Sequence, residues 1–120
     1  MATTYIETDQ CPRVKLAGAR GVVAEIVNRD LCGAKNIVAM LRWLKEGERF
    51  DAESMKDKHQ LIYLMEGGGV ITLENRDYEV SKGAGVYLGP SETAGFRQAG
   101  SAPLKLLHLI VVKVRTRTLL

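Results

Sequence analysis

The sequence predicts an all-β fold, either a sandwich or a barrel of antiparallel strands. Short apolar segments recur along the chain and are interrupted every eight to twelve residues by Gly, Pro, Asn or Asp, a spacing typical of such folds. Several segments alternate with the two-residue period of a strand. The 120 residues, 46% of them apolar, are enough to bury one hydrophobic core. We therefore expect one domain over residues 1–120 that folds without a disulfide or a structural metal.

Eight segments are expected to be strands: residues 22–27, 37–44, 60–65, 70–74, 78–80, 86–88, 95–98 and 104–114. The second segment is ambiguous, because Ile37, Leu41 and Leu44 also fit helical spacing over residues 34–46. A buried strand fits as well, because Ile37, Ala39, Leu41 and Trp43 alternate with Val38, Met40, Arg42 and Leu44. We prefer the strand.

A hairpin is expected between the fourth and fifth strands. Asn75 lies between them and tolerates the left-handed conformation that a tight turn requires.

The last expected strand runs into a basic end of the chain. The net charge is +3, and every charged residue after Glu92 is positive. Lys113, Arg115 and Arg117 alternate with neutral residues, so a strand would place all three cations on one face. Such charges discourage edge-to-edge association. The segment has no aromatic residues between its cations, and we expect neither a nucleic acid nor a membrane as partner.

The cysteines and the first residues indicate the compartment. Cys11 and Cys32 lack metal-binding spacing, and two thiols fit a reducing environment. Residues 1–9 are polar and acidic, unlike a signal peptide, and no apolar run reaches the ~18 residues of a membrane span. A cytoplasmic location is expected.

Glycines and apolar residues between Gly47 and Gln98 follow a recognisable spacing. Gly47 and Gly67 bound a segment, about 47–67, that resembles the first cupin motif, G(X)5HXH(X)3-4E(X)6G, in every interval. Residues 83–98 resemble the second motif, G(X)5PXG(X)2H(X)3N, with Pro90 displaced by one position. The resemblance to the cupin family implies a double-stranded β-helix, the jelly-roll barrel.

The resemblance also locates the metal-ligand positions of this family. Metal-binding cupins place three histidines and one glutamate where this sequence has Glu53, Met55, Gln60 and Ala94. These four side chains offer a single anionic ligand, so we expect no metal and no other cofactor. A displaced site that uses His59, distantly similar to the manganese-dependent ureidoglycine aminohydrolases, is the alternative. Strand alternation opposes it, because His59 points outward if Gln60 points inward.

The family frame implies a mainly apolar cavity with a few polar groups, which suits a small organic ligand. Its expected lining is Arg42, Glu53, Met55, Gln60, Ile62, Ala94, Phe96, Gln98 and His108. Arg42 should pair with an acid such as Glu53 or with a ligand carboxylate. His108 lies among leucines and is expected either as a core residue with satisfied nitrogens or as a proton carrier lining the cavity.

Two classes of function follow. The first is a metal-free, small-molecule-binding protein with a sensing or accessory role. The second is a metal-independent acid–base enzyme, such as an isomerase, cyclase or lyase, in which Glu53 and His108 are catalytic. A glutamate buried in an apolar barrel would have a raised pKa suited to proton transfer. A metal-dependent enzyme ranks third. Cupins often dimerise through sheet edges and exchanged terminal strands, so the apolar run 104–112 predicts a homodimer.

Overall fold

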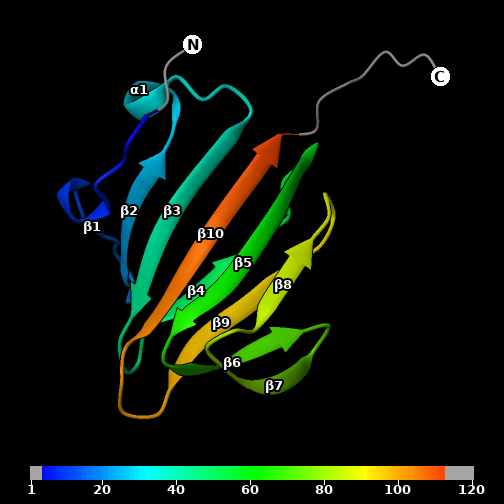
Figure 1. Cartoon of the computed structure of the whole chain (residues 1–120). Helices are drawn as coiled ribbons and strands as arrows, with labels where there is room; N and C mark the ends of the chain where they lie inside the picture. Colours follow the sequence, from blue (N-terminus) through cyan, green and yellow to red (C-terminus); the bar gives the residue numbers. More distant parts are fainter. Residues whose placement is uncertain (1–3, 113–120) are drawn as a thin grey trace.

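Two antiparallel sheets face each other in the computed structural model, which describes residues 4–112 (Figure 1). The larger sheet has the strand order β1-β2-β3-β10-β5-β8, and the smaller has the order β4-β9-β6-β7. The bounds of the larger sheet are β1 Val14–Lys15, β2 Val22–Val27, β3 Ile37–Leu44, β10 Leu104–Val112, β5 Lys58–Glu66 and β8 Gly85–Leu88. Those of the smaller sheet are β4 Arg49–Ala52, β9 Ala94–Ala99, β6 Gly68–Leu73 and β7 Arg76–Ser81.

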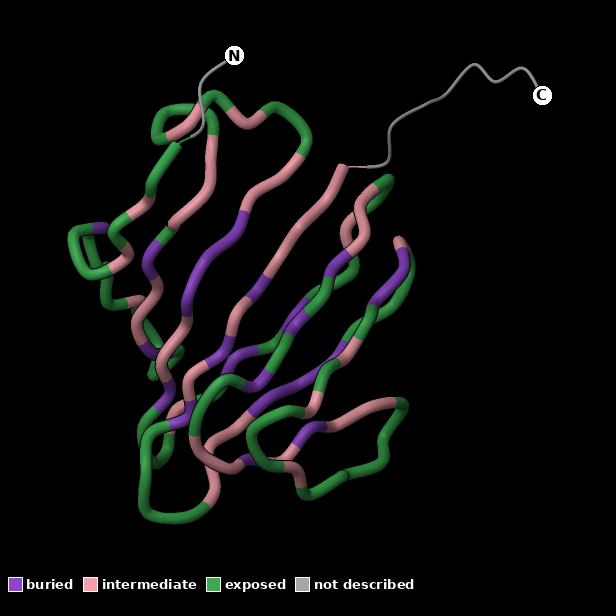
Figure 2. Tube along the Cα trace, viewed as in Figure 1, coloured by how far each residue is buried: buried purple, intermediate pink, exposed green. Residues whose placement is uncertain are grey.

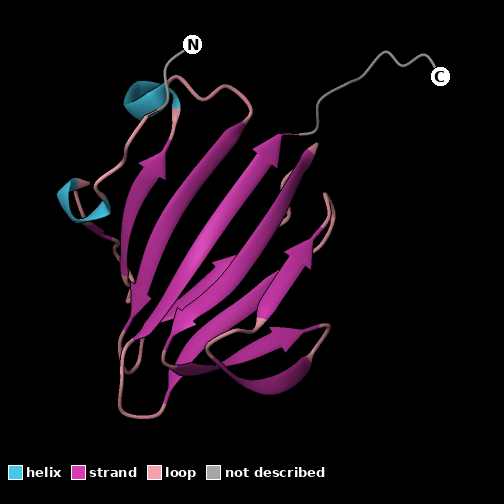
Figure 3. Ribbon diagram, in the orientation of Figure 1, coloured by secondary structure: helices cyan, strands magenta, loops and turns pink. Residues whose placement is uncertain are grey.

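Within residues 4–112, the helices are two short turns near the first strands (Figure 3). The 3-10 helix η1 covers Thr8–Gln10, and α1 covers Arg29–Cys32. Asn28 caps α1, because its side-chain oxygen accepts from the Leu31 N–H at 2.8 Å. Within residues 4–112, neither helix is long enough to cross a membrane.

The predicted all-β fold is confirmed. The strands expected at 22–27 and 37–44 have the predicted bounds, so the helical alternative for 34–46 is wrong. The other expected strands are present with small shifts at their ends. The last one is described as far as Val112, and the predicted row of Lys113, Arg115 and Arg117 lies outside the described residues. Two strands were not predicted, β1 and β4.

The hairpin between β6 and β7 has the predicted turn. Leu73 pairs with Arg76, so Glu74 and Asn75 form a two-residue turn. Their φ values are +49° and +66°, as in the type I′ turns that match the twist of paired strands.

The core lies between the sheets, where buried residues line the strands (Figure 2). Strand alternation places one face of each strand inside. The buried apolar cluster comprises Leu44, Phe50, Ala52, Ile62, Leu64, Ile71, Leu88, Ala94, Phe96, Leu104 and Leu106. Gly67, the second glycine of the predicted first motif, closes one end of the barrel. It has a φ of +83°, and a Cβ there would collide with the Pro103 carbonyl oxygen.

The opposite end of the barrel is open. There β4 ends and β9 begins, because Ala52 pairs with Ala94. β5 begins and β8 ends at the same level, because Gln60 pairs with Leu88. The loop of residues 53–57 crosses this end from one sheet to the other. The four metal-ligand positions of the family frame therefore lie at the open end of the barrel. They are Glu53, Met55, Gln60 and Ala94.

Candidate functional site

Three polar side chains on neighbouring strands form a row inside the barrel. Arg42 on β3 lies opposite Leu106, and His108 lies two residues further along β10. His108 lies opposite Ile62 of β5, and Gln60 lies two residues further toward the open end. Diagonal neighbours of this kind are within reach of long side chains. The register therefore joins Arg42 to His108 across 66 residues of sequence, and His108 to Gln60 across 48.

Hydrogen bonds along this row run in one direction. A guanidinium can only donate, so Arg42 Nε donates to His108 Nδ1 at 3.1 Å. His108 then carries its proton on Nε2 and donates to Gln60 Oε1 at 2.8 Å. Gln60 Nε2 donates in turn to the backbone carbonyl of Glu53 at 2.9 Å. The row fixes His108 as a neutral imidazole and ties the loop of residues 53–57 to the barrel interior.

Phe50 on β4 supports this row from the facing sheet. The Arg42 guanidinium carbon lies 3.9 Å from the centroid of the Phe50 ring, a cation–π contact. The His108 ring centroid lies 5.1 Å from the same ring, and Phe96 stacks on Phe50 at 5.6 Å. Aromatic packing therefore holds the guanidinium and the imidazole in place.

Burial lowers the pKa of both titratable members of the row, His108 and Arg42. Burial, together with the positive charge of Arg42, lowers the pKa of His108 to about 4. Burial, together with the nearby charge of Arg20, lowers the pKa of Arg42 to about 10. At neutral pH the row therefore holds a neutral histidine beside a charged arginine.

A cleft of about 420 Å³ opens beside this row. The loop between β1 and β2 forms one wall, and β4 with the following loop forms another. The lining residues are Leu16, Arg20, Arg42, Phe50, Asp51, Ala52, Glu53, Met55, Gln60 and His108. The cleft thus combines apolar side chains with a few convergent polar groups, and its size suits a small organic molecule.

Comparison with known proteins supports the architecture. No family model matches the sequence. An uncharacterized protein of Methanocaldococcus jannaschii is 38% identical over 48 residues, which cover 40% of this chain and 38% of that protein. A predicted oxalate decarboxylase from Thermotoga maritima superposes with a TM-score of 0.79 and 15% identity, over 91% of this chain and 99% of that one.

A further solved structure decides the fold. It is an RmlC-like cupin from Shewanella frigidimarina, with a TM-score of 0.70 and 12% identity over 92% of each chain. The chain has the cupin fold. Other structures with this fold include a putative sugar phosphate isomerase and a polyketide cyclase, so the cupin fold does not by itself define a reaction.

The cupin frame brings most of the predicted cavity residues together. Arg42, Glu53, Met55, Gln60 and His108 all line the 420 Å³ cleft. His108 is only 1% exposed, and both of its ring nitrogens are hydrogen-bonded, so it combines a core position with a place on the cleft lining.

Ala94 lines an adjoining cleft that it shares with Glu53. Ile62 and Phe96 do not line the cleft. They are 0% and 1% exposed and belong to the buried apolar cluster between the sheets.

Two predicted positions need correction. Glu53 is exposed rather than buried, because it follows the last residue of β4 and lies on the loop at the rim. The predicted catalytic role of Glu53 depended on burial of its carboxylate in an apolar barrel, and this burial is not present. Gln98 lies four residues beyond Ala94 on β9, at the closed end of the barrel. Its amide donates to the carbonyls of Gly100 and Ala102 at 2.7 and 2.8 Å and so fixes a loop.

The predicted partner of Arg42 is also corrected. Ion pairs within residues 4–112 join Arg49 to Asp51, Arg97 to Asp77 and Lys105 to Glu66, and none involves Arg42 or Glu53. Arg42 instead meets the neutral ring of His108. The contributions of Phe50 and Arg20 to this cleft were not predicted from the sequence. Phe50 could have been found from the alternation of Arg49, Phe50, Asp51 and Ala52.

The metal-ligand positions of the cupin frame do not fit a divalent metal ion. Both polar atoms of the Gln60 amide are engaged in hydrogen bonds, Met55 offers only a thioether, and Ala94 has no donor atom. No group of three or more His, Cys, Asp or Glu side chains in the described part of the chain could hold a metal. His59 does not line the cleft. It stacks on Tyr87 of β8, and its Nδ1 lies 2.5 Å from the Tyr87 hydroxyl.

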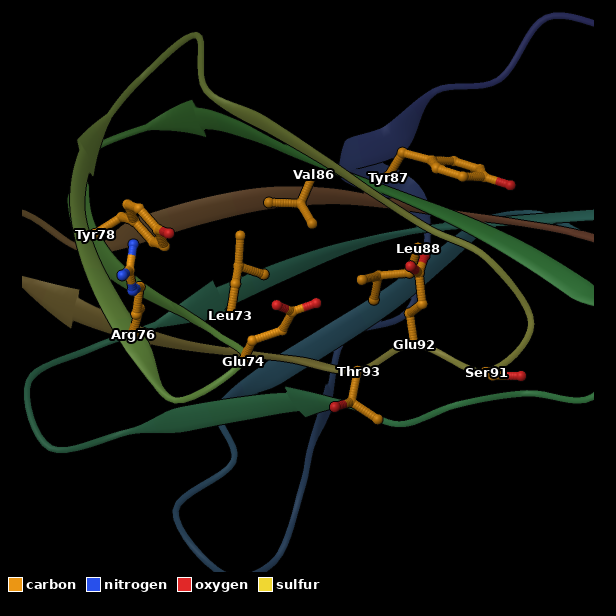
Figure 4. Close-up of a pocket in the computed structure, with 10 residues that line it drawn as sticks. All are labelled: Leu73, Glu74, Arg76, Tyr78, Val86, Tyr87, Leu88, Ser91, Glu92 and Thr93. Atoms are coloured by element: carbon orange, nitrogen blue, oxygen red, sulfur yellow. The ribbon is translucent and has the colours of Figure 1, made fainter.

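A larger cleft of about 700 Å³ lies between β8 and the β6–β7 hairpin. Figure 4 shows Leu73 and Val86 pointing into it, while Glu74 and Glu92 reach in from the loops. Glu92 accepts the Gly89 N–H at 2.6 Å and so stabilises its own turn. Every polar side chain that lines this cleft is exposed, whereas the smaller cleft contains the buried Gln60 and His108. The smaller cleft is therefore the stronger candidate.

Proposed function

We propose that this cupin binds a small organic molecule in the 420 Å³ cleft and does so without a metal ion. The observation that carries the proposal is the hydrogen-bonded row of Arg42, His108 and Gln60. It occupies the barrel interior beside the metal-ligand positions of the cupin frame. Buried polar groups with fixed geometry orient a ligand, and the apolar walls of Phe50 and Met55 supply contact area. A sensing or accessory role suits such a site.

An acid–base enzyme is the second candidate, and the exposed carboxylate of Glu53 on the cleft lining favours it. His108 is a weak partner for such chemistry. Both of its nitrogens are engaged, and burial beside Arg42 lowers its pKa to about 4, too low for an effective general base at neutral pH. Binding therefore ranks above catalysis.

A metabolite screen separates the two candidates. Protein treated with a chelator is screened by thermal shift against small organic compounds, and each hit is repeated with Glu53→Gln. Under the binding proposal, at least one compound raises the melting temperature of both proteins and is recovered unchanged. Turnover by the wild type that Glu53→Gln abolishes would favour the enzyme instead. A chelated protein that binds none of the compounds, while a metal-loaded sample does, would refute metal-free binding.

We also propose that the protein is a homodimer that associates through the outer face of the larger sheet. Leu61 and Tyr63 of β5 and Tyr87 of β8 point away from the core and are 40%, 41% and 59% exposed. The outward-facing Leu107 and Leu109 of β10 lie between β5 and β3 and extend this apolar surface. Apolar residues gathered on one exposed sheet face are typical of protein–protein contacts.

A further inference from the structure

The charge of Arg42 has no counter-ion in the described part of the chain. Its guanidinium is half-buried, and its hydrogen-bond partners are neutral: His108 Nδ1 at 3.1 Å and the Met40 sulfur at 3.4 Å. A guanidinium has five N–H donors, and these two contacts use two of them. The remaining donors belong to the two terminal nitrogens, which form the fork that matches a carboxylate.

The packing of Arg42 orients this fork. One face of the guanidinium lies on the Phe50 ring, at 3.9 Å from its centroid, while Nε is held by His108. A planar group held on one face and at Nε has little freedom to turn. A guanidinium fixed in this way loses little further entropy when it binds an anion.

Two arginines and two carboxylates line the cleft, and Arg42 is the least exposed of the four. Arg20, on the loop between β1 and β2, lines the same cleft and adds a second positive charge. Of the two carboxylates on the lining, Asp51 is paired with Arg49 at 2.8 Å. Glu53 is exposed on the rim loop. An anionic group that reaches Arg42 therefore meets a positive charge with which no carboxylate of residues 4–112 forms an ion pair.

We infer that Arg42 is the anion-binding centre of the cleft and holds the carboxylate of a small organic acid through its two terminal nitrogens. This inference rests on the proposed function and specifies the class of ligand. Arg20 contributes long-range attraction. The body of the acid lies against Phe50 and Met55, which favours an organic acid over a free inorganic oxyanion. A guanidinium then supplies the positive charge that a metal ion supplies in metal-binding cupins.

The inference is tested by comparing acids with their neutral amides. Chelator-treated protein is titrated with benzoate, pyruvate and glycolate, with the primary amide of each, and with inorganic phosphate. Binding is followed by calorimetry and by the NMR signal of the Arg42 Nε–H. We expect at least one carboxylate to bind roughly ten-fold tighter than its amide, since a charge-assisted pair is worth more than a neutral hydrogen bond. The same carboxylate should shift the Arg42 signal.

Three variants locate the effect. Arg42→Gln should abolish the preference for the carboxylate, whereas Arg97→Gln, on the outer face of the smaller sheet, should retain it. Because Arg42→Gln also removes a donor to His108 and could disturb the fold, Arg20→Gln serves as a second variant. Arg20 is exposed, so its replacement should weaken carboxylate binding a few-fold and leave amide binding unchanged.

The possible outcomes distinguish a failure of this inference from a failure of the proposed function. A wild type with no preference for any carboxylate, or a preference that survives Arg42→Gln in folded protein, overturns the inference. Phosphate that binds at Arg42 as tightly as every carboxylate overturns the choice of an organic acid. Neutral compounds that bind the cleft without charge preference would leave the proposed function standing and remove only this inference. If neither the acids, the amides nor the screened compounds bind, both fall.

Discussion

Arg42 Nε lies 3.1 Å from His108 Nδ1, so a permanent hydrogen-bond donor faces the lone pair of a buried imidazole. The contact exists only while His108 is neutral, because a protonated ring would place one N–H against another. The charge of Arg42 and the protonation state of His108 are therefore linked.

The stability of the protein should fall as the pH falls from 6.5 to about 4. Burial and the Arg42 charge lower the pKa of native His108 from 6.5 to about 4, so the unfolded chain binds more protons in this window. The free energy of unfolding therefore increases with pH between about 4 and 6.5. Above pH 6.5 His108 is neutral in both the folded and the unfolded chain and causes no further change. The loss across the window should be about 3 kcal/mol, measured by urea denaturation at constant ionic strength.

Two variants show whether His108 causes this dependence. His108→Gln should flatten the profile in that window, even though its overall stability is lower. His59→Gln removes the other histidine, which lies on the outer face beside Tyr87, and should keep the wild-type profile. A profile in His108→Gln as steep as in the wild type would show that other groups are responsible.

Gln60→Leu should destabilise the protein through loss of hydrogen bonds. Leucine keeps a similar volume, but the buried Nε2–H of His108 loses its acceptor and the Glu53 carbonyl loses its donor. We expect a loss of about 1–3 kcal/mol in the free energy of unfolding, measured by chemical denaturation. Gln10→Leu, at an exposed position, should change it by less than about 0.5 kcal/mol. Equal effects of the two substitutions would mean that the row does not stabilise the fold.

Leu61→Lys should weaken the proposed homodimer. The side chain is 40% exposed on the outer face of the larger sheet, so a lysine is compatible with folding but not with an apolar interface. Loss of one buried leucine contact should raise the dimer dissociation constant by roughly ten-fold or more. Light scattering coupled to gel filtration measures the effect. Tyr78→Lys, on β7 and 44% exposed, is the control and should not change the mass. A monomeric wild type would contradict the proposal.

Restoring the ligands of the cupin frame should create a metal site. The variant Glu53→His, Met55→His, Gln60→Glu, Ala94→His places three imidazoles and a carboxylate at the barrel mouth, a set suited to Mn²⁺ or Zn²⁺. We expect a gain in bound metal relative to the wild type, measured by equilibrium dialysis. A folded variant that binds no more metal than the wild type would show that these four positions do not converge as the frame requires.

Local pattern predicted the strands because alternation and turn residues act over a few positions. The strand at 37–44 was recognised by its alternation, and the β6–β7 turn by Asn75, whose φ is +66°. β1 was missed because two residues are too few to show a period. β4 was missed because it has only four residues and two of them are charged.

The site was harder to predict because it depends on register between distant strands. The family frame correctly brought Glu53, Met55 and Gln60 to one cleft. The contact of Arg42 with His108 depends on a diagonal alignment of β3 and β10, which no local pattern encodes. Gln98 was wrongly expected to line the cavity. The alternation of β9 predicts which face of the sheet its side chain lies on, but not how far along the barrel it lies. Four residues at about 3.3 Å each separate it from Ala94.

The metal content of the protein most directly tests our proposal that this chain of cupin fold binds its ligand without a metal ion. The wild type is purified without a histidine tag and without chelators, and its Mn, Fe, Ni, Cu and Zn are measured by elemental analysis. The same sample is titrated with a compound that bound in the thermal-shift screen. We predict metal far below one ion per chain together with undiminished binding. A stoichiometric metal whose removal abolishes binding would contradict the account.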